Sequence, residues 1–264
     1  MPGPTRVCVV GACGRMGERV RAGLASEPGM RLGAALEAPG HPRLGEPIAG
    51  GLELSSDLKA ALSVCDVVVD FSTPASTLRV LDAAAERPIP CVIGTTGLST
   101  AERERVAEFG RRIPVVLAPN FSVAVCLLVH LVREAARRLG PGYDAEILEL
   151  HHRSKRDAPS GTALRLAEAV AEGRADGARA ALVTARSGET GARPPGAIGV
   201  QALRGGDNPG EHSVLFLGEG ERLELAHRAA TRDHFVRGAL RAARWVLDRS
   251  PGIYAMEDVL GLHS

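Results

Sequence analysis

The chain contains very few lysines and very few aromatic residues. Only two of its 32 basic residues are lysine, Lys59 and Lys155, and all the others are arginine. Aromatic residues make up 3% of the 264 positions, so the core has to be built from Val, Leu, Ile and Ala. Such a core suits parallel strands that are covered on both faces by helices.

The chain also lacks an excess of charge of one sign. Its formal net charge is +1, whereas nucleic-acid-binding and membrane-surface proteins usually carry a one-sided balance. The 45% hydrophobic and 24% charged residues are typical of a globular protein and exclude a mainly disordered chain. This length predicts one large domain or two of medium size.

The five cysteines are scattered and form no CxxC pair. We therefore expect neither a disulfide framework nor a metal site, and a reducing cytoplasm fits this cysteine usage. No apolar run approaches the ~18 residues of a membrane span, and the first residues show no signal-peptide pattern. The expected location is the cytoplasm.

The first half of the chain alternates short apolar strands with helices. Strands are expected at 6–10, 30–37, 66–71, 90–94 and 114–118. Helices are expected at 15–27, 57–63, 75–86 and 100–112, the last with Thr100 as its N-cap. This alternation predicts βαβ units and a parallel sheet, so residues 1–121 should form a Rossmann-type, doubly wound dinucleotide-binding domain.

The pattern changes after residue 121. Helices are expected at 123–139 and 161–172, and strands at 144–151, 180–185, 199–203, 212–217 and 222–227. Successive strands without long helices between them indicate a mixed or antiparallel sheet. We predict a smaller α+β domain over 122–232 for substrate binding and oligomerisation. A helix at 233–248 and a tail at 252–262 should return to the first domain, which then comprises 1–121 and 233–264.

The first strand is followed by a glycine-rich segment of seven residues: Gly11, Ala12, Cys13, Gly14, Arg15, Met16 and Gly17. Glycines here let the backbone approach a pyrophosphate, and the N–H groups of the helix start attract its charge. The GxxGxxG spacing is a variant of the usual fingerprint and also occurs in ordinary turns. Its position in the first βα turn favours dinucleotide binding.

Glu37 ends the second strand, about 20 residues after Gly17. An acid there accepts hydrogen bonds from the adenosine ribose hydroxyls, although a solvated strand-end carboxylate is the alternative. Ala38 follows where a base would pair with a 2′-phosphate. NADH is therefore the preferred cofactor, and the nearby Arg43 keeps NADPH possible.

Two further segments follow later strands of the same predicted sheet. They are Gly94, Thr95 and Thr96, and then Ala118, Pro119, Asn120 and Phe121. Ligands bind beyond the carboxyl ends of parallel strands, so both segments should border the cofactor cleft. Ordinary turn chemistry is the alternative interpretation.

The segment 151–162 (HHRSKRDAPSGT) combines two histidines, one of the two lysines and a helix start. Ser160 is a natural N-cap, and the N–H groups after it can hold a carboxylate. Histidine and lysine can exchange protons, whereas arginine cannot. A solvated basic loop is the alternative. A metal site of His151 and His152 is disfavoured because successive strand side chains point to opposite faces.

Other candidates have simpler interpretations. His212 and His227 border apolar runs and are interpreted as strand positions on a sheet face. Lys59 lies in a short polar helix and is expected to be exposed.

Several motifs, in this order, resemble those of the dihydrodipicolinate reductase (4-hydroxy-tetrahydrodipicolinate reductase) family of the diaminopimelate–lysine pathway. The resemblance runs from about residue 7 to 262, and the string HHRxKxDAPSGTA is its most specific part. The motifs are VVGACGRMG (9–17), VVDFSTP (68–74), VIGTTG (92–97), APNFSVAV (118–125), ELHHRSKRDAPSGTA (149–163), PGAIGVQALRGGDNPGEH (195–212) and MEDVLGL (256–262).

The resemblance implies reduction of a cyclic, unsaturated imine dicarboxylate to tetrahydrodipicolinate by NAD(P)H, in a homotetramer held together by the sheet of the second domain. It implies that residues 11–16 hold the pyrophosphate, that Glu37 holds the ribose, and that 94–96 and 118–121 line the nicotinamide side. His151 is then the proton donor and acceptor, and Lys155 the second proton donor. His152, Gly161 and Thr162 bind the substrate. Many relatives carry a basic residue where this chain has Ala38.

Two other functions remain open at this point. A different two-domain dehydrogenase, such as one acting on a semialdehyde, would need a catalytic cysteine at a helix start, and Cys126 within an apolar helix is a poor candidate. A non-catalytic dinucleotide sensor would not need the HHRxK string beside an anion-binding helix start.

Overall fold

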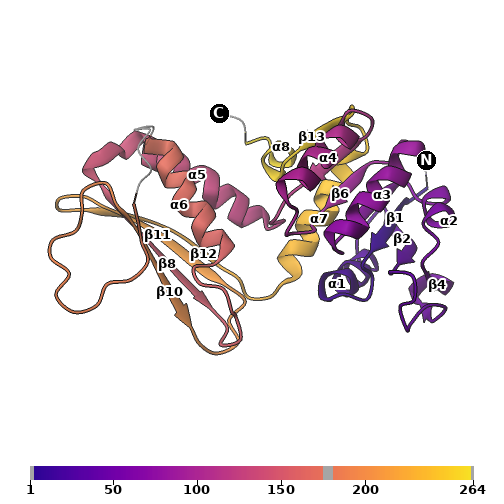
Figure 1. Cartoon of the computed structure of the whole chain (residues 1–264), viewed down its shortest axis with the longest axis horizontal. Coiled ribbons are helices and arrows are strands. Elements are labelled where there is room, and N and C mark those ends of the chain that lie inside the picture. The colour runs from indigo at the N-terminus through magenta and orange to yellow at the C-terminus, as the bar shows by residue number, and fades with distance from the viewer. Residues whose placement is uncertain (1–2, 175–180, 263–264) are drawn as a thin grey trace. The chain divides into compact units, whose positions relative to one another are not determined.

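The computed structural model describes residues 3–174 and 181–262 (Figure 1). The chain divides into two compact units. Unit 1 comprises Met1–Val123 together with Asp233–Ser264, and unit 2 comprises Ala124–Arg232. None of the described helices has both the length and the apolar character that crossing a membrane requires.

Unit 1 contains an eight-stranded sheet in the order β13-β7-β6-β5-β1-β2-β4-β3. The chain starts at β1 and extends the sheet in both directions, which makes it doubly wound as predicted. All neighbouring strands are parallel except β3 and β4, an antiparallel edge pair that the sequence analysis missed. The strands are β1 Thr5–Val10, β2 Met30–Leu36, β3 Pro47–Ile48, β4 Leu52–Ser55, β5 Val67–Asp70, β6 Cys91–Ile93, β7 Pro114–Leu117 and β13 Gly252–Tyr254.

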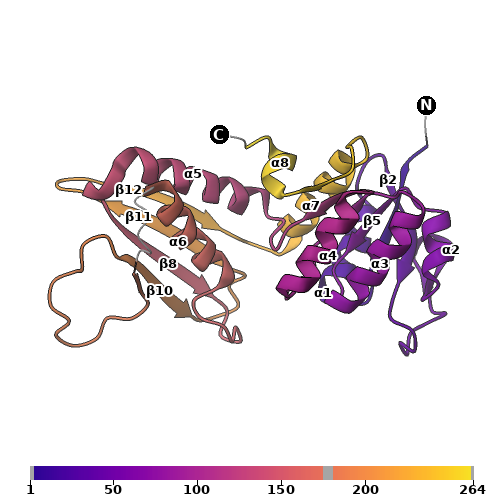
Figure 2. The same ribbon diagram turned by 45° about the horizontal axis from the view of Figure 1, so that its top comes forward.

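Helices cover both faces of this sheet (Figures 1 and 2). Helices α1 and α7 pack against each other on one face, and α7 also contacts β5, β6 and β7. On the other face α3 contacts both α2 and α4. Successive side chains of a strand point to opposite faces of the sheet. Those of Cys8 and Val68 lie in the core that α2, α3 and α4 cover. The helices are α1 Arg15–Leu24, α2 Leu58–Ser63, α3 Pro74–Glu86, α4 Thr100–Gly110, α7 Asp233–Val246 and α8 Met256–Leu260, with a short 3₁₀ turn η1 at Ala49–Gly51.

The start of α4 differs from the prediction by one residue. The N-cap is Ser99, not Thr100, because Ser99 and Glu102 form a reciprocal capping box. The Ser99 hydroxyl accepts from the backbone N–H of Glu102 at 3.3 Å, and the Glu102 carboxylate accepts from the backbone N–H of Ser99 at 2.7 Å. Two donors of the helix start are satisfied in this way, which Thr100 could not achieve.

The C-terminal segment returns to unit 1, as predicted. Strand β13 pairs in parallel with β7, and α7 packs so closely on the end of β7 that a Cβ at Gly238 would lie 1.7 Å from the carbonyl oxygen of Phe121. Glycine at 238 therefore lets α7 contact the backbone of the segment that follows β7.

Unit 2 contains a five-stranded mixed sheet in the order β12-β11-β8-β10-β9. Strands β8, β10 and β9 are parallel, whereas β11 is antiparallel to both β8 and β12. The predicted strand over 180–185 is reduced to two residues, and Ala180 lies outside the described residues. The elements are α5 Val123–Leu139, η2 Gly140–Gly142, β8 Asp144–His151, α6 Gly161–Arg174, β9 Leu182–Val183, β10 Ile198–Arg204, β11 Glu211–Leu217 and β12 Arg222–Arg228.

Helices α5 and α6 cover one face of this sheet and enclose the second core (Figure 2). Ala145 and Ile147 of β8 point into that core. The residues between and beside them point the other way, and Leu148 is 41% exposed there. Leu203 of β10 is 50% exposed. Unit 2 therefore leaves apolar side chains on the sheet face that its own helices do not cover.

Candidate active site

The glycine-rich loop after β1 is shaped by backbone contacts that exclude larger side chains. Gly11 has a φ of +70°, and a Cβ there would lie 2.8 Å from the carbonyl oxygen of Phe71. A Cβ on Gly17 would lie 2.0 Å from the carbonyl oxygen of Gly11. The N–H groups of Gly11 and Ala12 donate to the carbonyl oxygen of Leu36 at 3.0 and 3.1 Å, which fixes the loop against β2.

The start of α1 is arranged to receive an anion. Its N-cap is Gly14, and in the part of the chain that the structure describes no side chain caps this helix. The backbone N–H groups of its first turn are therefore left for a ligand, and the helix dipole adds positive potential. This helix start and the tight glycine loop together form the segment that the sequence analysis assigned to a pyrophosphate.

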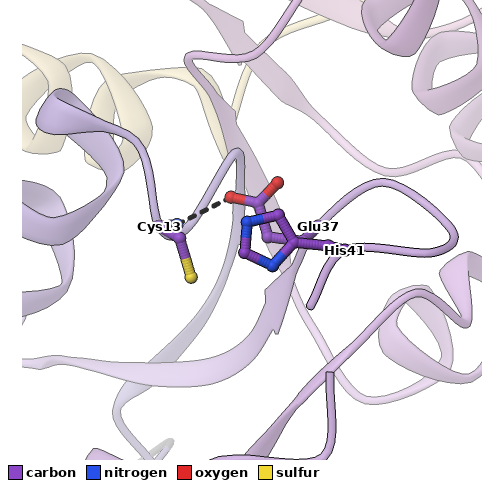
Figure 3. Close-up of side chains that lie close together, drawn as sticks. All are labelled: Cys13, Glu37 and His41. Atoms are coloured by element: carbon purple, nitrogen blue, oxygen red, sulfur yellow. Dashed lines mark hydrogen bonds between the residues drawn. The ribbon is translucent and has the colours of Figure 1, made fainter. Parts of the chain in front are cut away.

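Glu37 lies directly beside this loop (Figure 3). Its Oε1 accepts a hydrogen bond from the backbone N–H of Cys13 at 2.7 Å, and its own N–H donates to the carbonyl oxygen of Ser55 at 2.9 Å. The carboxylate is half-buried and retains lone pairs for further donors. It can therefore hold ribose hydroxyls next to the pyrophosphate loop.

A pocket of about 350 Å³ opens at the carboxyl ends of the unit 1 strands. Eight of the residues predicted to bind cofactor line it, and Phe71, Ser72 and Phe235 complete its wall. Six residues predicted to bind cofactor are not among the lining residues: Gly11, Ala12, Cys13, Gly14, Glu37 and Ala118. The predicted residues that line the pocket are Arg15, Met16, Gly94, Thr95, Thr96, Pro119, Asn120 and Phe121.

Phe71 and Ser72, which the sequence analysis did not assign to the site, form part of the pocket wall. The ring of Phe71 packs edge-on against Phe121 with centroids 5.6 Å apart, and it lies so close to Gly94 that a Cβ there would be 2.1 Å from the ring. The hydroxyl of Ser72 is buried in the pocket wall and interacts with the Asp70 carboxylate. Its oxygen can also accept a hydrogen bond from a polar group of a bound ligand. The position of Ser72 just after β5 was the signal that could have identified it.

A buried polar network supports this wall from behind. Asp70, at the end of β5, accepts from the Thr77 hydroxyl at 2.6 Å and from the backbone N–H of Ser72 at 2.9 Å. The Thr77 hydroxyl also lies 2.9 Å from that of Thr95. Burial raises the pKa of Asp70, although the hydrogen bonds from Ser72 and Thr77 oppose this. The network holds the Ser72 turn and Thr95 in fixed positions.

Unit 2 places a second polar cluster at adjacent positions on three strands. Glu149 and His151 lie on the same face of β8, two residues apart. The sheet register pairs Arg204 of β10 with His151 and pairs His212 of β11 with Glu149. Of these four residues, the sequence analysis assigned a catalytic role to His151 alone. His212, which it interpreted as an ordinary strand position, belongs to the cluster.

Glu149 is the centre of this cluster and is only 1% exposed. Its carboxylate accepts two hydrogen bonds from the Arg204 guanidinium, both at 2.9 Å, and one from the backbone N–H of Ser160 at 3.0 Å. It also contacts Nδ1 of His151. Burial raises the pKa of Glu149, but the hydrogen bonds from Arg204, His151 and Ser160 outweigh it and hold the pKa below its ordinary value. Glu149 is therefore an ionised, fully paired carboxylate.

His151 is oriented by this carboxylate. With Nδ1 paired to Glu149, the nitrogen that remains for proton exchange is Nε2, next to Gly210, where a Cβ would approach it to 2.9 Å. Burial lowers the pKa of His151, while Glu149 opposes the shift. The imidazole, 8% exposed, is thus held at Nδ1 by Glu149, while Nε2 lies beside Gly210.

His212 packs edge-on against His151, with ring centroids 5.1 Å apart. Its Nε2 lies 3.2 Å from the hydroxyl of Ser160, and its buried Nδ1 has no hydrogen-bond partner in the ranges that the structure covers. Burial lowers the pKa of His212 to about 4, with the nearby His151 acting in the same direction. His212 is therefore neutral at physiological pH and forms an uncharged wall beside His151.

The remaining predicted residues lie around the start of α6. The ammonium group of Lys155 is paired with both carboxylate oxygens of Asp157 at 2.9 Å. Nε2 of His152 lies 3.3 Å from the guanidinium of Arg232. Ser160 caps α6 as predicted, since its hydroxyl accepts from the N–H of Ala163 at 3.2 Å. Gly161 is exposed and follows this cap directly.

Comparison with known sequences identifies the family. Models of the N-terminus and the C-terminus of dihydrodipicolinate reductase match residues 5–121 and 124–260. The chain belongs to the dihydrodipicolinate reductase family. It is 48% identical to a 4-hydroxy-tetrahydrodipicolinate reductase of Anaeromyxobacter dehalogenans (strain 2CP-1) over 98% of both chains. It is 46% identical to the enzyme of that name from Geobacter sulfurreducens, over 98% of this chain and 99% of the other.

The fold agrees with this membership. A dipicolinate-bound dihydrodipicolinate reductase from Paenisporosarcina sp. TG-14 superposes with a TM-score of 0.81 at 26% sequence identity, covering 97% of this chain and 99% of that one. The family resemblance inferred from the motifs is confirmed, and the chain is an NAD(P)H-dependent oxidoreductase. Cys126 is 8% exposed inside α5, so it offers no support for the alternative of a semialdehyde dehydrogenase.

Proposed function

We propose that this chain reduces 4-hydroxy-tetrahydrodipicolinate to tetrahydrodipicolinate with NAD(P)H, as a step of diaminopimelate and lysine biosynthesis. The observation that carries the proposal is the buried Glu149–His151 pair beside the capped start of α6, within a chain 48% identical to reductases of that name. The cofactor, when bound, supplies the hydride. The residues of the chain bind, orient and exchange protons.

The cofactor site is assigned to unit 1. Residues 11–16 and the start of α1 hold the pyrophosphate, and Glu37 holds the adenosine ribose. The segments 94–96 and 118–121 border the nicotinamide. Ser72 joins them, because its hydroxyl lies in the same pocket wall.

The substrate site is assigned to the start of α6 and the basic segment before it. A dicarboxylate needs cations and N–H donors, which His152, Lys155, Gly161 and Thr162 supply. The partner of Lys155 is Asp157, whose side chain is 62% exposed. The Lys155 side chain is 20% exposed, but the Asp157 end of the pair faces solvent, so we expect a substrate carboxylate to replace Asp157 at the Lys155 ammonium.

Proton transfer is assigned to His151 and Lys155. After hydride delivery, the negative charge that develops on the substrate needs a proton donor. His151 can transfer a proton at Nε2 because Glu149 holds Nδ1. Lys155 is the second donor. Glu149 acts through His151 and is a positioning residue.

Cofactor preference, oligomeric state and location are also part of the proposal. Ala38 beside Glu37 favours NADH over NADPH. A comparison of kcat/KM for the two cofactors tests this, and a clear NADPH preference would contradict it. We expect a homotetramer, supported by the exposed Leu148 and Leu203 on the uncovered sheet face and testable by analytical ultracentrifugation. The expected location is the cytoplasm.

The decisive experiment is NADH oxidation in the presence of the product formed by dihydrodipicolinate synthase. The Lys155→Ala variant should lose turnover by about 10²-fold or more while its affinity for NADH stays nearly intact. Lys155→Arg should fail as well, because arginine retains the charge but cannot donate a proton. Lys59→Ala, at the exposed second lysine, is the matched control and should keep full turnover. An absence of NADH oxidation would point to another dehydrogenase reaction.

A further inference from the structure

Three potential metal ligands meet beside the glycine-rich loop of unit 1 (Figure 3). They are Cys13, Glu37 and His41, and their ligand atoms all lie within 4.8 Å of one another. The residues come from the loop after β1, from the end of β2 and from the turn that follows β2. No short sequence motif contains them, which is why the spacing of the cysteines alone predicts no metal site.

The backbone holds these side chains in place. The N–H of Cys13 donates to Oε1 of Glu37 at 2.7 Å. His41 closes a turn in which its N–H donates to the carbonyl oxygen of Ala38 at 3.0 Å, and Gly40 has a φ of +84°, which favours glycine at that position. All three side chains are half-buried. An ion at the cluster would remain accessible from solvent while meeting a preformed arrangement.

We propose that Cys13, Glu37 and His41 form a binding site for a divalent cation of the zinc type. Thiolate, imidazole and carboxylate are all ligands of Zn²⁺, and three of them leave one coordination position for water. Mg²⁺ and Ca²⁺ prefer oxygen ligands throughout, so they fit this set poorly. With metal–ligand bonds of about 2.0–2.3 Å, tetrahedral ligand atoms lie about 3.5 Å apart. The widest separation must therefore shrink by roughly 1 Å, within reach of side-chain rotation.

Metal binding here releases the proton of the Cys13 thiol, because a thiol binds Zn²⁺ as the thiolate. Nδ1 of His41 accepts a hydrogen bond from the backbone N–H of Arg43 at 3.3 Å, which leaves Nε2 for a metal ion.

A bound metal competes with the dinucleotide. This step rests on the proposed function, in which Glu37 holds the adenosine ribose and the loop around Cys13 holds the pyrophosphate. Both ligands use Glu37 and the space beside Cys13, so an ion at the cluster and the dinucleotide should exclude each other. Zn²⁺ at this site should therefore inhibit the enzyme competitively with NADH and should leave the substrate cluster around His151 unaffected.

Metal binding is tested first without turnover. The protein is treated with a chelator and titrated with Co²⁺, whose bond to a thiolate produces a charge-transfer absorption in the near ultraviolet. We expect this absorption in the parent protein, its loss in Cys13→Ser, and its suppression by saturating NADH. Its absence from the parent, or its persistence in Cys13→Ser, would overturn the site. Because this measurement requires no substrate, it remains informative even if the proposed reaction is wrong.

Inhibition is tested with His41→Ala, whose residue has no assigned part in turnover. Without added metal its kcat and its KM for NADH should equal those of the parent. Zn²⁺ should inhibit it at least about tenfold more weakly, and in the parent NADH should relieve the inhibition. His130→Ala, at a half-buried histidine of unit 2, is the matched control and should retain full sensitivity. Unchanged sensitivity of His41→Ala, or inhibition that NADH does not relieve, would refute the proposal.

Discussion

Acid should destabilise the fold through His212. This residue is 4% exposed, and burial lowers its pKa from 6.5 to about 4, with His151, His227 and Lys155 adding to the shift and Glu149 opposing it. In the unfolded chain the imidazole titrates at its ordinary pKa. Between pH 6.5 and about 4 the unfolded state therefore binds a proton that the folded state does not. The stability due to neutral His212 is full above pH 6.5 and falls as the pH decreases through this window.

The size of the effect follows from the two pKa values. One pH unit inside the window corresponds to about 1.4 kcal/mol, so His212 alone should lower the free energy of unfolding by about 2 kcal/mol between pH 8 and pH 5. The comparison is His212→Gln, whose amide can still meet the Ser160 hydroxyl but does not titrate. Urea denaturation at both pH values should show that the parent loses about 2 kcal/mol more than the variant. Equal losses in the two proteins would refute the reasoning.

Three other substitutions test separate parts of the structure. Glu149→Gln leaves the Arg204 charge unpaired and His151 unsupported, so kcat should fall by about 10²-fold or more and its pH profile should shift, while KM for NADH stays the same. Gly17→Ala places a Cβ 2.0 Å from the Gly11 carbonyl oxygen, so NADH affinity measured by fluorescence quenching should drop by about tenfold or more. An unchanged affinity would contradict the inference that the loop has no room for a side chain at position 17. Ser99→Ala removes the α4 capping box and should lower the free energy of unfolding by about 1 kcal/mol with unchanged kinetics, as thermal denaturation and the standard assay can show.

Local patterns in the sequence predicted most of the longer elements, although β3, β4, β13 and α8 were not predicted as such. The strand expected at 144–151 is β8 with the same ends, and the glycines of the first βα turn predicted the loop that Gly11 and Gly17 shape. Ser99 was missed as the N-cap because Thr100 is an equally good capping residue in isolation. The reciprocal bond to Glu102 decides between them.

The other half of the site depends on pairing between distant strands. Glu149, Arg204 and His212 lie within motifs of the family resemblance, but nothing local shows that their side chains meet or that Glu149 is buried. They become a cluster only through the register that pairs His212 with Glu149 and Arg204 with His151. Cys13 and His41 meet for the same reason, since the end of β2 must first be placed beside the loop. Sequence periodicity predicts which face a residue takes but not its neighbour on the next strand.

We expect enzyme activity to depend on the correct register of the strands in the mixed sheet of unit 2. A slip of β11 by one residue against β8 would turn Val214 and Phe216 away from the core, and the same slip would remove His212 from His151. If His151 acts as proposed, a molecule with the wrong strand alignment would lose the cluster that holds it. We therefore expect misaligned molecules to be less active than correctly aligned ones, so that turnover can help to follow refolding.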